Sequence, residues 1–217
     1  MEVSSAASEV ALGNLYHIFL VSGKNQHALE VADTLVVKLG TEDSRMRRVN
    51  ALVLAGKAEL AVNELEALKS TNHQIVDNPM WIALASSAHY SLHQADKALN
   101  ILERGISANP ESAELHLALA KLQTQMRRED EARESFQRAE ELSPQHPEIL
   151  SYFGQFLYFN GEWASALERF EKIGAKSPFN PLFPRFVACL LNSGMIDDCL
   201  ECVCEWRSVT TNTDETV

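Results

Sequence analysis

Three cysteines near the end of the chain have a spacing that could support metal or redox chemistry. Cys199, Cys202 and Cys204 stand close together, with two residues between the first two and one between the last two. A zinc site needs about four ligands, yet the last histidine of the chain, His146, lies far upstream. The alternatives are that the thiols are small core residues, or that the last helix, with Trp206, faces a partner. We predict four reduced thiols, including Cys189, and no metal or other cofactor.

A pair of histidines is the next candidate for metal chemistry. His89 and His93 stand four residues apart, a spacing that places two side chains on one face of a helix. No third ligand joins them in a recognisable motif. We therefore expect both to be ordinary hydrogen-bonded or solvated histidines.

The chain carries no signature of a catalytic site. A phosphate-binding loop, a glycine-rich dinucleotide fingerprint and a nucleophile elbow are all missing from the sequence. The carboxylates between Arg127 and Glu141 alternate with arginines, which is typical of a solvated, salt-bridged helix face. We predict that this chain is not an enzyme.

The composition is that of a folded, acidic protein. The chain has 217 residues, of which 46% are hydrophobic, and a formal net charge of −11 at pH 7. Such an acidic balance disfavours binding to nucleic acid or to an anionic membrane surface. The first residues, Met1-Glu2, lack the basic character of a secretory signal, and the apolar stretch 15–21 is too short to span a bilayer. We predict a cytoplasmic protein without membrane insertion.

An internal repeat sets the elements that would have to position any site. Each copy has a small residue, a larger one four positions later and a third apolar or small residue three positions after that. The first residue of this pattern recurs at intervals of 33, 37, 34, 34 and 33 residues, in the order Ala28, Ala61, Ala98, Ala132, Ala166 and Cys199. In four copies a glycine stands five positions earlier; these are Gly23, Gly56, Gly161 and Gly194. Apolar residues spaced three and four apart indicate packed helices.

The pattern resembles the tetratricopeptide repeat, a 34-residue helix–turn–helix unit with the signature Trp-x2-Leu-Gly-x2-Tyr, then Ala-x3-Phe-x2-Ala-x4-Pro. The fifth copy matches best, with Phe153-Gly154, Ala166, Phe170 and Pro178 at the corresponding positions. The resemblance covers roughly residues 9 to 207. It implies an all-α fold, an α-α superhelix (a tetratricopeptide-like solenoid) of about six helix-turn-helix units, because one pair alone cannot bury its apolar stripe.

On this basis we predict a single solenoid over residues 1–208 and a flexible polar tail over 209–217. The units are expected at residues 9–40, 43–73, 79–110, 113–144, 147–178 and 181–207. The longer interval between the second and third copies spans Ser70 to Pro79. We interpret it as a longer loop across which the pairs still stack; the alternative is a hinge between the first two units and the last four.

The resemblance also implies where a partner would bind, because the first helices of such repeats line the concave face. The predicted partner-binding residues are His89, Leu117, Lys121, Gln125, Gln155, Tyr158, Phe159, Arg185 and Asn192. Members that bind chaperone tails hold a carboxylate with paired Lys and Asn or Arg. The corresponding pairs here are Ile82/Ser86, Leu117/Lys121, Ser151/Gln155 and Arg185/Cys189, so that clamp is missing.

The predicted function is a non-catalytic scaffold or adaptor for protein–protein interaction, which binds a partner peptide or amphipathic helix in the concave groove. Tyr158 beside the cation of Lys121 predicts a partner segment with an apolar anchor and an acid. Two alternatives stay open. One is a dedicated cytosolic chaperone for a secretion or pilus-assembly subunit, and the other is the N-terminal repeat region of a larger enzyme.

Overall fold

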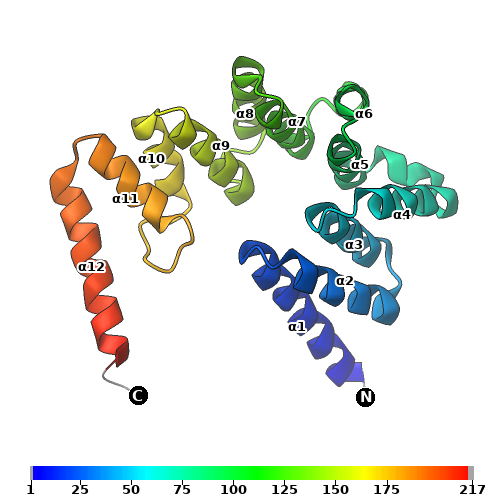
Figure 1. The fold of residues 1–217 in the computed structure, drawn as a ribbon, viewed down its shortest axis with the longest axis horizontal. Coiled ribbons are helices and arrows are strands. Elements are labelled where there is room, and N and C mark those ends of the chain that lie inside the picture. Colours follow the sequence, from blue (N-terminus) through cyan, green and yellow to red (C-terminus); the bar gives the residue numbers. More distant parts are fainter. Residues whose placement is uncertain (1, 215–217) are drawn as a thin grey trace. The chain divides into compact units, whose positions relative to one another are not determined.

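A computed structural model describes the backbone of residues 2–214 and the side chains of residues 9–207. The described residues form twelve α-helices, with one 3₁₀ helix and no β-strand among them (Figure 1). The predicted all-α solenoid fold of about six helix–turn–helix units is therefore confirmed.

The helices follow one another in six pairs, each joined by a three-residue turn. The pairs are α1 (Glu2–Val21) and α2 (Asn25–Leu39); α3 (Glu42–Leu54) and α4 (Ala58–Thr71); α5 (Pro79–Ser91) and α6 (Ala95–Ala108); α7 (Ala113–Gln125) and α8 (Glu129–Leu142); α9 (Pro147–Phe159) and α10 (Trp163–Lys172); and α11 (Phe183–Asn192) and α12 (Ile196–Asp214).

The described chain divides into two compact units. The first ends at Leu122 and the second begins at Gln123, so the boundary lies within α7. The single solenoid over residues 1–208 stays a prediction. At the C-terminal end, α12 continues beyond residue 208, where the sequence predicts the tail to begin, as far as Asp214. The last three residues of that predicted tail lie outside the described part.

The middle residue of every turn within a pair has a left-handed backbone. Four of these residues are the glycines that the repeat pattern marks. In the third and fourth pairs the same conformation is adopted by His93, with φ of 60°, and by Arg127, with φ of 61°. A side chain there meets a steric cost that glycine avoids. His93 stands five positions before Ala98, where other copies have the turn glycine, and it accordingly lies in a turn.

The polar stretch between the second and third pairs contains a short 3₁₀ helix, η1 (His73–Asp77). Ile75 of η1 is buried in a core that extends from Tyr16 on α1 to Ala88 on α5. The side chain of Asn78 then accepts a hydrogen bond of 2.8 Å from the backbone N–H of Met80 and caps α5. This continuous packing favours the longer loop over the hinge.

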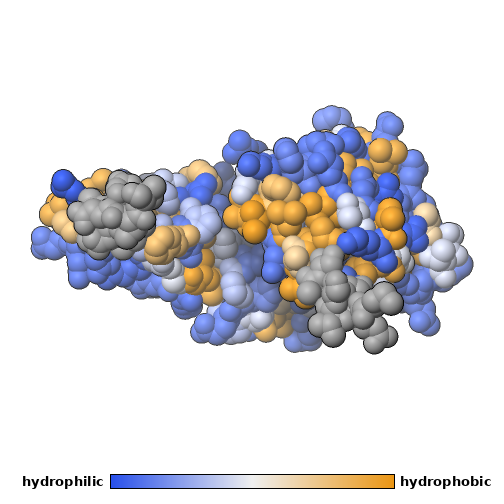
Figure 2. Space-filling model, turned by 90° about the horizontal axis from the view of Figure 1, so that it is seen from below, coloured by the Kyte–Doolittle hydropathy of each residue, from blue (hydrophilic) through white to orange (hydrophobic). Residues whose placement is uncertain are grey.

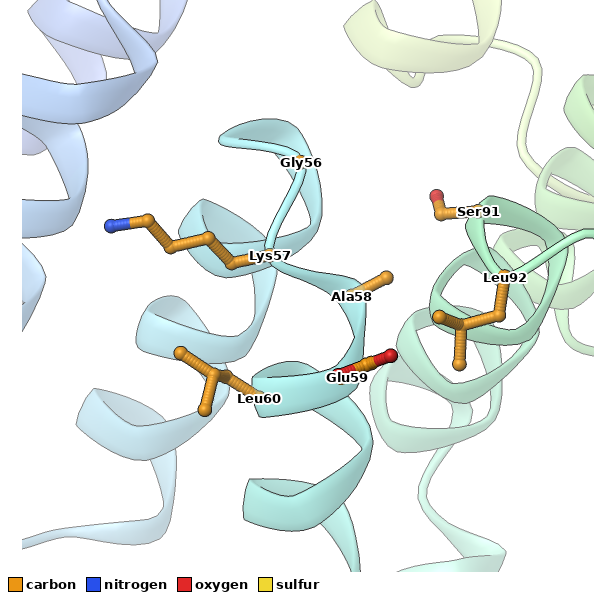
Figure 3. A pocket seen from close by; sticks show the side chains of 7 residues that line it. All are labelled: Gly56, Lys57, Ala58, Glu59, Leu60, Ser91 and Leu92. Atoms are coloured by element: carbon orange, nitrogen blue, oxygen red, sulfur yellow. The ribbon is translucent and has the colours of Figure 1, made fainter.

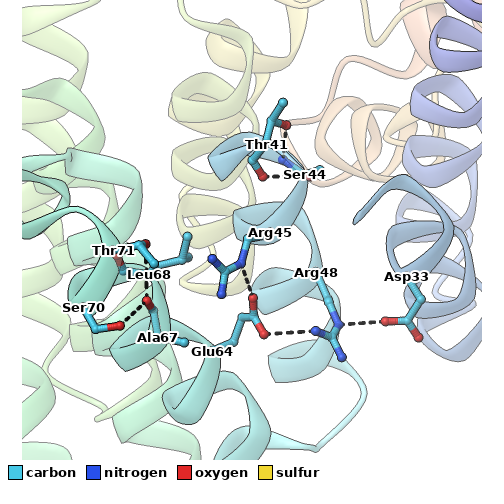
Figure 4. A network of polar contacts seen from close by, with 10 residues as sticks. All are labelled: Asp33, Thr41, Ser44, Arg45, Arg48, Glu64, Ala67, Leu68, Ser70 and Thr71. Atoms are coloured by element: carbon cyan, nitrogen blue, oxygen red, sulfur yellow. Dashed lines mark hydrogen bonds and ion pairs between the residues drawn. The ribbon is translucent and has the colours of Figure 1, made fainter. Parts of the chain in front are cut away.

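Ion pairs link the second helix pair to the first. Glu64 on α4 accepts hydrogen bonds from Arg45 (2.6 Å) and Arg48 (3.0 Å) on α3, and Arg48 also donates to Asp33 on α2 at 2.7 Å (Figure 4). The neighbouring Arg47 is paired with Asp43. These three arginines are therefore all paired with carboxylates of their own unit.

Aromatic rings form much of the core of the C-terminal unit. Phe136 on α8 stacks on Phe153 of α9 and also contacts Phe156, with ring centroids 5.2 Å apart in both cases. Gly154 of α9 lies so close to Phe170 of α10 that a Cβ at this position would be 2.6 Å from the ring. The absence of a side chain at Gly154 thus allows α9 and α10 to approach each other.

Candidate functional site

A group of aromatic side chains and one cation lies at the C-terminal end of α9. Phe159 is 72% exposed, and the half-buried Tyr158 meets it edge to face with ring centroids 5.4 Å apart. Tyr158 also contacts Trp163 at the start of α10, at 5.3 Å. The guanidinium of Arg185 on α11 lies 5.8 Å from the centroid of the Phe159 ring. We call these four residues the aromatic–arginine cluster.

The turn between α9 and α10 brings the cluster together. Gly161 reverses the chain with φ of 78°, so Trp163, five residues after Tyr158 in sequence, comes to lie against it. Glu162 in this turn is held by two hydrogen bonds from the guanidinium of Arg133 on α8, one of them 2.9 Å long. The same guanidinium lies 5.6 Å from the Phe156 ring. The cluster is therefore held by packed elements before any partner arrives, which lowers the entropic cost of binding.

The fold that carries this cluster is shared with solved structures. TTC0263, a thermophilic TPR protein of Thermus thermophilus, superposes with a TM-score of 0.64 at 19% identity, covering 84% of this chain and 99% of that one. PilF of Pseudomonas aeruginosa superposes with a TM-score of 0.56 at 14% identity, covering 95% of this chain and 93% of that one. In the sequence, residues 89–151 match the profile of the tetratricopeptide repeat family. The chain is a tetratricopeptide repeat protein.

One curated relative also aligns with most of this repeat protein. The cytochrome c-type biogenesis protein CycH of Pseudomonas aeruginosa is 30% identical over 160 residues, which cover 73% of the present chain. The same alignment covers 37% of CycH. The repeat protein thus spans little more than a third of the length of that relative.

Three of the predicted partner-binding residues meet in the aromatic–arginine cluster, namely Tyr158, Phe159 and Arg185. Two others lie on the same two helices: Gln155 is half-buried and donates to Ser151, and the exposed Asn192 donates to the carbonyl oxygen of Ala188 at 2.7 Å. Gln125, at the end of α7, is exposed.

The remaining three predicted residues belong to the N-terminal unit. His89 is buried, its Nδ1 lies 2.9 Å from Oε1 of Gln94, and burial lowers the pKa of its imidazole. Leu117 is buried as well, and Lys121 is half-buried on α7. His89 and Leu117 therefore offer a partner little surface. Arg185 is the cation that lies against Phe159, and the predicted contribution of Lys121 to partner binding stays a prediction.

Trp163 is the member of the cluster that sequence reasoning missed. It follows the turn glycine by two residues, and an aromatic side chain at this place in a repeat would have been a usable signal. Trp163 contacts Tyr158, whereas Phe159, the next residue of α9, is the most exposed ring of the cluster.

Three of the four cysteines pack as small core residues. All four are free thiols, and Cys189, Cys199 and Cys202 are buried whereas Cys204 is exposed. Burial raises the pKa of the Cys189 thiol to about 11 and also raises the pKa of Cys202. Among the described side chains, no three His, Cys, Asp or Glu residues come together in a way that could hold a metal ion. In the same part of the chain, no helix has the length and apolarity needed to cross a membrane.

A shallow pocket of about 300 Å³ lies where the turn before α4 meets the end of α5. In Figure 3, Ser91 and Leu92 face Ala58 and Glu59 across it. The other lining residues are Gly56, Lys57 and Leu60. The pocket has no histidine or cysteine in its lining, and its charged residues, Lys57 and Glu59, are exposed. This hollow lacks the buried polar groups that fix a small ligand.

Proposed function

We propose that this tetratricopeptide repeat protein is a non-catalytic scaffold that binds a segment of a partner protein at the aromatic–arginine cluster. The fold itself suggests a scaffold for protein–protein interaction. The observation that carries the proposal is Phe159, a large aromatic ring that is 72% exposed and yet fixed by Tyr158 and Arg185. Aromatic and arginine side chains are enriched among the residues that dominate binding energy at interfaces.

The proposed surface extends along two helices. Gln155 and Phe159 stand four residues apart on α9, and Arg185 and Asn192 stand seven apart on α11. Both spacings return a side chain to the same face of a helix. Gln155 and Asn192 would thus flank the cluster as polar groups, which fits the usual arrangement of a polar rim around an apolar centre.

The chemistry of the cluster points to the kind of segment that it takes. The exposed ring of Phe159 suits an aliphatic or aromatic anchor. The guanidinium of Arg185 is a fork of donors that matches a carboxylate. We therefore expect a peptide or helix in which an apolar side chain stands close to an Asp or Glu.

Selection from a random 12-residue peptide library displayed on phage tests this function. Selection on the wild-type protein, with counter-selection on the Tyr158→Ala/Arg185→Glu variant, should enrich sequences that pair an apolar anchor with an acid. Failure to enrich any sequence over background, or enrichment of basic peptides, would contradict the proposal.

A role in the assembly of c-type cytochromes is a second candidate, and the observation that favours it is the 30% identity with CycH. In this role the scaffold would act as an assembly factor, which is close to the chaperone alternative raised by the sequence. Deletion of the gene in its own organism should then lower the haem-stained bands of c-type cytochromes on a denaturing gel. Unchanged bands would exclude this role while leaving peptide binding intact. The cytoplasmic location expected from the sequence stays a prediction.

A further inference from the structure

The last helix carries an exposed apolar stripe. This helix, α12, lies next to the C-terminus in Figure 1. It carries three exposed apolar side chains, which are Ile196 (58% exposed), Leu200 (57%) and Val203 (42%). Their spacing of four and three residues places them along one side of the helix. Leu191, at the end of the preceding helix α11, is also 58% exposed. By contrast, Cys199 and Cys202 are buried, so the stripe lies beside the side of α12 that packs into its own repeat.

Comparison with the other repeats shows that the exposure is peculiar to the sixth unit. The position of Val203 is at most 2% exposed in the five preceding units, where it is held by Ala32, Leu65, Leu102, Phe136 and Phe170. In the fourth unit the reason is visible, because Phe136 contacts Phe153 and Phe156 on the first helix of the next pair. The corresponding face of α12 has the position and apolar character of a surface that accepts one more helix.

The edge of this stripe is acidic. Asp197 and Glu201 follow Ile196 by one and five residues, which turns them by roughly 100° and 140° around the helix axis, to one side of the stripe. Asp198 and Glu205 add two further carboxylates to the exposed surface of α12. Lys176 lies 3.9 Å from the carboxylate of Glu201. A partner that brings basic side chains to this edge would be attracted electrostatically.

A second apolar surface lies on α1, where Val10, Ile18 and Val21 are exposed. Figure 2 shows apolar side chains gathered over this part of the N-terminal unit. Within the described side chains of α1, Glu9 is the one acidic residue, so no row of charges there indicates what would cover the surface. The face of α12 differs because the carboxylates beside it favour a partner with basic side chains.

We propose that Leu191, Ile196, Leu200 and Val203 form a docking surface for an amphipathic helix of a partner protein, with aliphatic residues along one face and lysines or arginines beside them. The aliphatic face covers the stripe, and the basic residues pair with Asp197 and Glu201. A second copy of α12 fits poorly, since it would bring like charges together at the edge of the contact. This surface shares no residue with the aromatic–arginine cluster, so its occupant is a second segment, distinct from the one proposed for the cluster.

The test uses the full chain and a fluorescent synthetic helix of about 18 residues, with leucines every third or fourth position and lysines on both flanks. Fluorescence anisotropy should show saturable binding. The Leu200→Ser/Val203→Ser variant should weaken it by about tenfold or more, and Asp197→Lys/Glu201→Lys by about fivefold. Val37→Ser, at a highly exposed position on α2, is the matched control and should bind as the wild type does. Circular dichroism verifies that each variant is folded.

Unchanged affinity in the Leu200→Ser/Val203→Ser variant would overturn the proposal. Equal binding of a peptide in which every lysine is replaced by glutamate would do the same. A dimer in analytical ultracentrifugation that this variant abolishes would also overturn it, because a second copy would then cover the face. Phe159→Ala should keep full affinity for the basic helix, so failure here is distinguishable from failure of the proposed function.

Discussion

Replacement of Gly154 by alanine should destabilise the C-terminal unit by a predictable amount. A Cβ at this buried position on α9 would lie 2.6 Å from Cε1 and 2.9 Å from Cδ1 of Phe170, a ring with no exposed surface. Overpacking a core costs about 1–3 kcal/mol, and an approach this close favours the upper end of that range. Alanine has a higher helix propensity than glycine by about 1 kcal/mol. The two effects together predict a net loss of about 2 kcal/mol in the free energy of unfolding.

Gly13→Ala on α1 is the matched control for this prediction. Its Cβ would meet the guanidinium of Arg47 at 3.7 Å, an ordinary van der Waals contact. Only helix propensity then acts, so we expect a gain of about 0.5–1 kcal/mol. Urea unfolding followed by far-ultraviolet circular dichroism measures both variants. A Gly154→Ala protein as stable as the wild type would refute the close packing of α9 against α10. Phe170→Leu in the Gly154→Ala background should recover part of the loss, because the two positions are in direct contact.

Three further predictions concern the turns, the thiols and the buried histidine. Arg127→Gly should raise the free energy of unfolding by about 0.5–1 kcal/mol, because Arg127 holds a left-handed backbone with φ of 61°; a loss in urea unfolding would contradict this. Ellman's reagent should label one thiol quickly in the native protein, the exposed Cys204, and four after denaturation. Cys189, Cys199 and Cys202 are buried, and burial also raises the pKa values of Cys189 and Cys202. Two or more fast thiols would be inconsistent with that burial. The free energy of unfolding should fall less between about pH 7.5 and pH 5 in the His89→Gln variant than in the wild type, as measured from urea midpoints. Because burial lowers the folded pKa of His89, the unfolded chain takes up the proton first below a pH of about 6.5, and stability falls; an equal loss in both proteins would count against it.

The repeat architecture could be predicted because it depends on residue size at fixed intervals. Ala132 and Ala166 stand at the small position of the repeat, and both are fully buried, as the close approach of helices requires. The turns at His93 and Arg127 could be predicted only from their positions in the repeat, because both stand where other copies have a glycine. Neither residue type signals a left-handed backbone by itself.

The candidate site could be predicted only in part. Tyr158, Phe159 and Arg185 followed from the expected position of the first helices. The contact of Trp163 with Tyr158 depends on how α10 folds back onto α9, and the spacing of residues along the chain does not encode that distance. Likewise, the contact of His89 with Gln94, the last residue of the following turn, depends on how the chain turns after α5.

The affinity of a selected acidic, apolar peptide for two phenylalanine variants tests the central claim most directly. Phe179 is 81% exposed in the loop 173–182, so Phe179→Ala removes a ring outside the cluster that is at least as exposed as Phe159. Isothermal titration calorimetry should show that Phe159→Ala raises Kd by about 30-fold, the equivalent of about 2 kcal/mol. Phe179→Ala should leave Kd unchanged. Equal effects of the two substitutions, or no effect of Phe159→Ala, would contradict a partner site at the aromatic–arginine cluster.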